Sequence, residues 1–123
     1  MHGGGGAGNP PYETTFLESD LFGDISGIKF VYPSSWRSGG IWYETYKNGC
    51  AASEVCAHNE SEVEESGTEV AALINYEKNL KGWSNGANIY LAGYSQGARM
   101  VYQVQFGALT YALGGCFVMC GYP

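Results

Sequence analysis

The pattern of apolar and polar positions predicts three short strands separated by helices. Residues 27–33 (GIKFVYP) form a β-branched and aromatic run that Pro33 ends. Residues 87–93 (ANIYLAG) and 115–121 (GCFVMCG) are two further apolar runs of strand length, and the last is apolar on both faces, which is typical of a central parallel strand. The order strand, helix, strand, helix, strand predicts an α/β fold.

The first helix is expected between the first two strands. Ser61 followed by Glu64 resembles a capping box at its start, and the helix is expected to end near Gly82. Its acidic start suits the positive end of a helix dipole. The apolar residues that recur at helical spacing are Val63, Val70, Leu73, Ile74 and Leu80.

A second helix is expected after Ser95, and two loop regions are expected before the first helix. One apolar stripe of this second helix is predicted to contain Tyr102, Phe106, Leu109 and Leu113, with a break at Gly107. Residues 34–59 show no sustained period and predict an ordered loop region with short turns. Residues 2–9 (HGGGGAGN) predict a loop, because glycine loses the most backbone entropy on ordering.

Length and charge narrow the class of protein. The 123 residues suffice for one domain and are too few for two with sizeable cores. Twelve acidic against six basic residues leave no cationic cluster, which argues against nucleic acid or an anionic membrane surface as a partner. No apolar stretch approaches the roughly 20 residues of a spanning helix, and no signal segment follows Met1. We therefore expect no spanning segment and a cytoplasmic location.

The four cysteines do not form metal-binding or scaffold spacing, and no metal or cofactor is expected. Cys116 and Cys120 lie in the last apolar run and are interpreted as buried thiols. Cys50 and Cys56 flank a polar loop and could bridge, and Asn59-Glu60-Ser61 matches a glycosylation acceptor. Together these two features indicate secretion as the alternative location. Free thiols and a chance tripeptide are the opposing interpretation.

Residues 93–97 (GYSQG) have the form G-x-S-x-G and lie between a predicted strand and a predicted helix. In such a turn a Cβ two positions before or after the serine would collide with backbone, which explains the glycines and exposes Ser95. The N–H of Gln96, at the start of the helix, would point toward developing negative charge. Chance occurrence is the alternative in a chain with 19 glycines, but the strand-turn-helix context favours a nucleophile.

Residues 2–6 (HGGGG) are typical of a loop that supplies a second backbone donor to an oxyanion hole. A tag remnant or an unstructured leader is the alternative interpretation. His2 precedes the serine, so we expect it to serve the shape of the loop rather than to act as a base.

These segments together resemble the phospholipase/carboxylesterase family of α/β-hydrolases, which includes acyl-protein thioesterases. The resemblance runs nearly from end to end, and the G-aromatic-S-Q-G turn is its most specific part. Cutinases share that turn, but the tryptophan-bearing loop at Ser35, Trp36 and Trp42 favours the former family. The segments that carry it are HGGGG, IKFVYPSSW, GGIWYETY, LAGYSQGARM and ALGGCFVMCGYP.

The resemblance implies a partial α/β-hydrolase fold, with a mostly parallel sheet and flanking helices, and hydrolysis of a carboxylic ester or thioester through an acyl-enzyme. Ser95 would be the nucleophile, and the backbone N–H groups of Gln96 and Gly4 would hold the oxyanion. Trp42 resembles the family's aromatic wall beside the site. Packing in the core or on the surface is an equally weighted interpretation of Trp42.

The sequence departs from the family pattern at both ends. In this fold the acid and the histidine follow the serine, but residues 96–123 contain no Asp, Glu or His. His58, in a polar loop, is expected to be a solvated residue rather than the base. The family also has a buried strand before the HG loop, where only Met1 precedes His2. We therefore expect residues 1–123 to be a single, incomplete domain, the nucleophile half, with little or no activity alone. The alternative is a non-catalytic, hydrolase-like binding protein.

Overall fold

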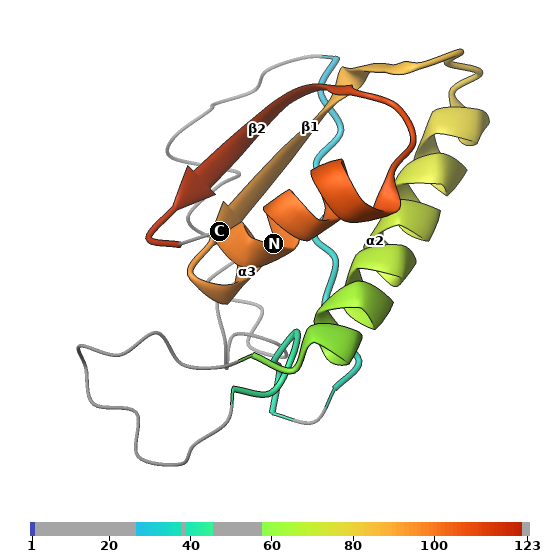
Figure 1. Cartoon of the computed structure of the whole chain (residues 1–123). Helices are drawn as coiled ribbons and strands as arrows, with labels where there is room; N and C mark the ends of the chain where they lie inside the picture. The colour runs from blue at the N-terminus through green and yellow to red at the C-terminus, as the bar shows by residue number, and fades with distance from the viewer. Residues whose placement is uncertain (2–26, 38, 46–57, 122–123) are drawn as a thin grey trace.

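The computed structural model describes residues 1, 27–37, 39–45 and 58–121, which contain three helices and two strands (Figure 1). The two strands lie side by side, α3 crosses one face of them and α2 runs alongside α3 and η1. Mixed helices with a parallel sheet form an arrangement compatible with a partial α/β fold. The elements in chain order are α2 (Glu60–Leu80), β1 (Gly86–Tyr94), α3 (Gln96–Tyr102), the π-helix η1 (Gln103–Ala108) and β2 (Leu113–Met119).

The sheet consists of β1 and β2 in parallel, with Tyr90 opposite Gly115 and Tyr94 opposite Met119. Parallel neighbours need a crossover of a dozen or more residues, which α3 and η1 provide here. The predicted strands at 87–93 and 115–121 are thus confirmed, although β2 begins and ends two residues earlier than expected.

The prediction that the last strand is buried on both faces is wrong. Phe117 is 62% exposed and Met119 is 55% exposed. Cys116 and Cys120 are free and exposed, so their interpretation as buried thiols is also wrong. The reason is that α3 packs against both strands but covers only one face of the sheet.

The predicted strand within residues 27–33 is also wrong. This segment has no strand conformation, and Ile28 and Val31 are largely exposed. A strand exists only where its backbone pairs with a neighbour, and the sheet of the described residues contains β1 and β2 alone. An apolar, β-branched composition is therefore not sufficient to make this segment a strand.

Helix α2 has the predicted extent but a different start. Its N-cap is Asn59, whose Oδ1 accepts the Glu62 N–H at 3.4 Å, so the capping box predicted at Ser61 is wrong. The helix ends before Gly82, whose φ of +67° suits glycine and ends the helical path. Gly67 lies inside α2, where glycine costs about 1 kcal/mol relative to alanine. Packing explains its presence, since a Cβ there would lie 2.7 Å from Cγ of Gln103 in η1.

The second predicted helix exists, but its predicted stripe is wrong. Phe106 is 79% exposed, and Leu109 and Leu113 lie beyond the helix. From Gln103 the backbone adopts the wider π-helical turn, which shifts the later side chains away from the 3.6-residue spacing. The side chains that do face inward are Ala98, Met100, Val101 and Val104.

The hydrophobic core is formed by side chains of α2, α3 and η1 together with the loop before α2. Partly buried side chains of β1 and β2, Ile89, Leu91 and Leu113 among them, pack against it. Its buried members are Trp42, Tyr43, Val63, Val70, Ile74, Met100 and Val104. None of the helices in the described ranges is long and apolar enough to cross a bilayer.

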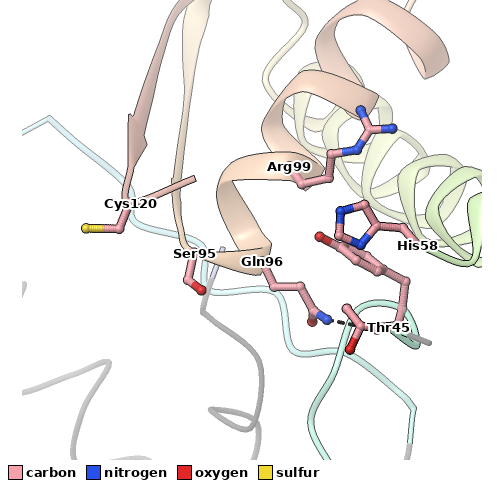
Figure 2. A pocket seen from close by; sticks show the side chains of 7 residues that line it. Thr45, His58, Ser95, Gln96, Arg99 and Cys120 are labelled. Carbon is pink, nitrogen blue, oxygen red and sulfur yellow. Dashed lines mark hydrogen bonds between the residues drawn. The ribbon is translucent and has the colours of Figure 1, made fainter. Parts of the chain in front are cut away.

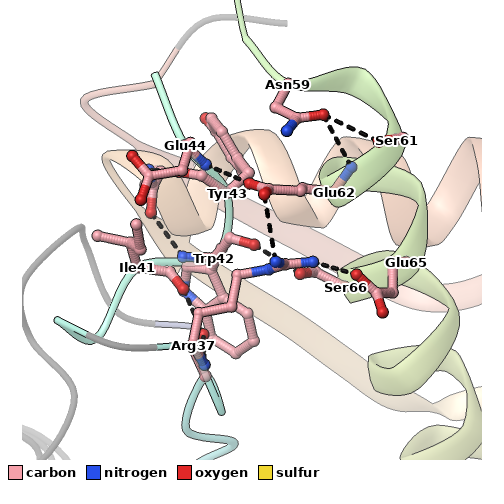
Figure 3. A network of polar contacts seen from close by, with 12 residues as sticks. Arg37, Ile41, Trp42, Tyr43, Glu44, Asn59, Ser61, Glu62, Glu65 and Ser66 are labelled. Carbon is pink, nitrogen blue, oxygen red and sulfur yellow. Dashed lines mark hydrogen bonds and ion pairs between the residues drawn. The ribbon is translucent and has the colours of Figure 1, made fainter. Parts of the chain in front are cut away.

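Polar contacts attach Arg37, Trp42 and Glu44 to α2 (Figure 3). Ser66 Oγ donates to the carbonyl of Trp42 at 2.5 Å, and the Glu44 N–H donates to a carboxylate oxygen of Glu62 at 2.6 Å. Arg37 forms ion pairs with Glu62, at 3.3 Å, and with Glu65. These contacts explain how a segment without regular secondary structure presents Trp42 and Tyr43 to the core.

Candidate active site

Ser95 occupies the turn between β1 and α3 in a strained backbone conformation. Its φ of 53° and ψ of −117° lie outside the regions that side chains other than glycine favour. Neighbouring backbone holds it there, since the Ser95 N–H donates to the Met119 carbonyl and the Ala98 N–H donates to the Ser95 carbonyl, both at 2.9 Å. Its side chain is exposed. This is a sharp strand-to-helix turn that presents a hydroxyl to solvent.

The glycine before this turn is required by sterics. A Cβ on Gly93 would lie 2.1 Å from the Gly97 carbonyl oxygen and 2.8 Å from the Ala98 nitrogen. Real Cβ contacts are never this short, so β1 could not approach α3 with any larger residue there. The prediction that a Cβ two positions before Ser95 would collide with backbone is confirmed.

Gln96 connects this turn to the loop that carries Trp42 and Tyr43. Its side-chain Oε1 accepts the Trp42 N–H and its Nε2 donates to the Tyr43 carbonyl, both at 2.8 Å. No hydrogen bond within the described segments uses the Gln96 backbone N–H, as is usual for the first residues of a helix. The sequence predicted a role for the backbone of Gln96 but not this contact of its side chain.

A pocket of about 220 Å³ opens beside the turn (Figure 2). Ser95 and Cys120 lie at one end of it, Arg99 and His58 at the other, and Gln96 between them. The residues that line it are Tyr43, Thr45, His58, Ser95, Gln96, Arg99 and Cys120.

The other predicted site residues are not among the described residues that line the pocket. The Trp42 side chain is 1% exposed and belongs to the core, as its packing interpretation expected, and it does not line the pocket. Gly4 and His2 lie outside the described residues, as do Cys50 and Cys56. Met1 is described and lies beside the turn, since its carbonyl accepts the Tyr94 N–H at 3.1 Å and its amino group donates to the Ala92 carbonyl.

His58 is not the freely solvated residue that the sequence predicted. It pairs with Thr45 in an isolated antiparallel bridge, and its ring and the Tyr43 ring form a T-shaped contact at a centroid distance of 5.0 Å. Burial lowers the pKa of His58 and the positive charge of Arg99 lowers it further, with Glu60 acting in the opposite direction. The two larger effects therefore disfavour the charged imidazolium form.

Two lining residues that the sequence analysis did not select could have been found from it. Arg99 follows Ser95 by four residues, so it lies about one helical turn beyond the serine, on the α-helix that begins at Gln96. Cys120 follows a strand parallel to β1, and the carboxyl ends of parallel strands share one edge of a sheet. Thr45 and His58 had no such signal, because an irregular segment brings them to the pocket.

Comparison with known proteins does not assign the chain to a family. No protein-family model matches the chain, and no curated protein is significantly similar to it. Across the described part of the chain, no three His, Cys, Asp or Glu side chains gather as metal ligands would.

Proposed function

We propose that this chain carries the nucleophile of a serine hydrolase, of the phospholipase/carboxylesterase type, that cleaves carboxylic esters or thioesters. The backbone at Ser95 is the observation that carries the proposal. A serine at φ 53° and ψ −117° costs free energy of order 1–3 kcal/mol, and such strain persists where the surroundings over-determine it. A strained, exposed serine between a strand and a helix is what a nucleophile elbow requires.

In the proposed reaction Ser95 Oγ attacks the carbonyl carbon of the substrate as its proton passes to a base. The carbonyl π electrons move to oxygen, and collapse of the tetrahedral intermediate expels the alcohol or thiol and leaves an acyl-enzyme. Water then attacks the acyl carbon and releases the acid and Ser95. No cofactor takes part in these steps.

The oxyanion would be held by the backbone N–H groups of Gln96 and Gly4. Support for Gln96 comes from its place at the first turn of α3 and from the absence of a partner for its N–H within the described ranges. Support for Gly4 comes from Met1, which lies against Tyr94 and directly precedes the HGGGG run. Removing one such donor typically lowers the rate by about 10²- to 10³-fold.

His58 is a poor candidate for the base although it shares the pocket with Ser95. A general base must become imidazolium, and both burial and Arg99 oppose that form. Residues 96–123 supply no other histidine and no carboxylate. We therefore propose that the activating groups are not among these residues and that the isolated chain turns over little or no substrate.

A fluorophosphonate probe tests the proposal without requiring turnover. Such probes phosphonylate an active-site serine hydroxyl, and oxyanion-hole donors assist that attack even without the base. We therefore expect slow labelling of the folded chain at Ser95, identified by peptide mass spectrometry, that exceeds the labelling of heat-denatured protein, and none at this position in Ser95→Ala. Heat-denatured protein and a variant of an exposed serine of α2, Ser61→Ala, serve as controls. Equal labelling of the unaltered chain and Ser95→Ala would remove Ser95 from the role proposed.

A non-catalytic, hydrolase-like binding protein is the second candidate. The observation in its favour is that His58, the histidine that lines the pocket with Ser95, is disfavoured in the imidazolium form that a base must adopt. This candidate predicts no probe labelling of a correctly folded chain, whereas the hydrolase proposal predicts labelling at one site.

A further inference from the structure

Arg99 is the one permanently charged side chain among the described residues that line the pocket. It lies on α3 one helical turn after Ser95. In Figure 2 its guanidinium group lies beside His58, at the opposite end of the pocket from Ser95. A ligand that fills the pocket would therefore contact a hydroxyl at one end and a cation at the other.

Within the described ranges, one hydrogen bond engages the Arg99 guanidinium group. A guanidinium group has five N–H donors, and one of them, on Nη2, donates to Glu60 Oε2 at 3.1 Å. The Nε–H is enclosed and has no acceptor in the described part of the chain. Because the Nε–H is enclosed, a ligand oxygen would bind instead to the remaining N–H groups of Nη1 and Nη2, on a side chain that is 21% exposed.

The existing partner of Arg99 is easily replaced. The Glu60 side chain is 63% exposed, whereas that of Arg99 is 21% exposed. An ion pair with one partner in solvent contributes little to stability, because water and salt screen it. Glu60 can therefore turn into solvent when another anion enters the pocket.

We propose that Arg99 binds a carboxylate of the substrate, so that the site takes esters or thioesters that carry a free carboxylate several bonds from the scissile carbonyl. The proposal rests on the proposed function, since it places the scissile carbonyl at Ser95. A singly charged carboxylate fits better than a doubly charged phosphate, because Glu60 already offsets part of the Arg99 charge and the chain has a net charge of −6.

The pKa of His58 provides a second signal of binding. Arg99 contributes to the lowered pKa of His58. A carboxylate seated on Arg99 offsets that positive field, which by itself raises the pKa of His58. Since Glu60 faces the same imidazole and its displacement acts in the opposite direction, the measured change is the balance of the two.

The test is a titration of the Ser95→Ala chain with monomethyl glutarate, followed by the NMR signals of His58 and of the α3 amides. This background prevents turnover of the ligand. We expect Arg99→Gln to weaken binding by at least about tenfold, and Arg99→Lys to weaken it less, because lysine keeps the charge and loses the planar fork. Lys29→Gln, which removes one exposed positive charge outside the pocket, should leave the Kd unchanged. Dimethyl glutarate, the neutral analogue, should bind at least tenfold more weakly.

Three results would overturn the inference: no binding of monomethyl glutarate, equal binding by Arg99→Gln, or equal binding of the neutral diester. If Arg99→Gln fails to fold by circular dichroism, Arg99→Lys and the diester give the same decision. Failure of this inference is separable from failure of the proposed function. Probe labelling at Ser95 without carboxylate binding refutes only the carboxylate site, and carboxylate binding without labelling refutes only the hydrolase.

Discussion

Gln96 and Trp42 are joined by a hydrogen bond from the Trp42 backbone N–H to the Gln96 side-chain oxygen, at 2.8 Å. The same amide group donates to the carbonyl of the next residue, Tyr43. Because Gln96 follows Ser95 directly, the proposed nucleophile is coupled to a loop more than 50 residues earlier in the chain. Glutamine suits this position because its amide group offers one acceptor and one donor at once.

Replacement of Gln96 by glutamate should keep the hydrogen bond with Trp42 and remove the one with Tyr43. The carboxylate keeps an acceptor for the Trp42 N–H but loses the donor and faces the Tyr43 carbonyl, so we expect a loss of about 2 kcal/mol in the free energy of unfolding. Urea denaturation measures it. Asn88→Asp makes the same chemical change at an exposed position of β1 and should have little effect. A loss in Gln96→Glu no larger than in this control would contradict a structural role for the contact.

Ser95→Gly should stabilise the chain while it removes the proposed nucleophile. Glycine adopts the backbone angles of Ser95 without strain, so the relief of strain outweighs the greater entropy of the unfolded chain, and we expect a net gain of about 1 kcal/mol. Ser95→Ala keeps the strain and should not show this gain. Equal stability of the two variants would mean that the turn stores no strain.

Gly93→Ala should be among the most damaging single changes in the chain. The new methyl group would meet the Gly97 carbonyl at 2.1 Å, and neither backbone can move without separating β1 from α3. We expect a loss above about 3 kcal/mol, measured by thermal denaturation. Gly115→Ala is the matched control, because its Cβ would meet the exposed Tyr90 ring at 3.1 Å and that side chain can move aside. Comparable losses in both variants would count against the steric argument.

Trp42→Phe distinguishes packing from substrate contact. The buried Trp42 side chain belongs to the core, so we expect a loss of about 1–3 kcal/mol in the free energy of unfolding. The rate of probe labelling at Ser95 should stay within about twofold in folded protein. Trp36→Phe changes a half-exposed tryptophan and should alter stability by less than about 0.5 kcal/mol. A large change in labelling rate with unchanged stability would restore the role of Trp42 as a wall of the site.

The lowered pKa of His58 predicts that stability falls as the pH is lowered. The unfolded chain takes up a proton near the ordinary histidine value of 6.5, whereas the folded chain resists it, so the free energy of unfolding decreases as the pH falls through 6.5. Denaturation at pH 7.5 and pH 5.5 measures this change. His58→Gln has no group that titrates in this range, and its decrease should be smaller. An equal decrease in both proteins would assign the effect to other residues.

The turn at Ser95 and the extent of α2 could be predicted from the sequence, because both depend on residues that are close together in the chain. The G-x-S-x-G pattern located a tight turn, and the collision at Gly93 is the steric reason that such patterns contain glycine. The extent of α2 followed from helical spacing and from Gly82 at its end. Its cap was misplaced by two residues, since Asn59 and Ser61 are both good capping residues and composition does not choose between them.

The sequence by itself determined the order of helix and strand from residue 60 onward and the position of Ser95 between them, because hydrophobic spacing and glycine sterics act over a few residues. Tertiary structure alone decided that residues 28–32 form no strand, that β2 is exposed, and that Thr45 and His58 share a pocket with Ser95. Strand pairing, burial and the pKa of His58 depend on contacts between residues that are distant in the sequence, and a local sequence pattern does not specify those contacts.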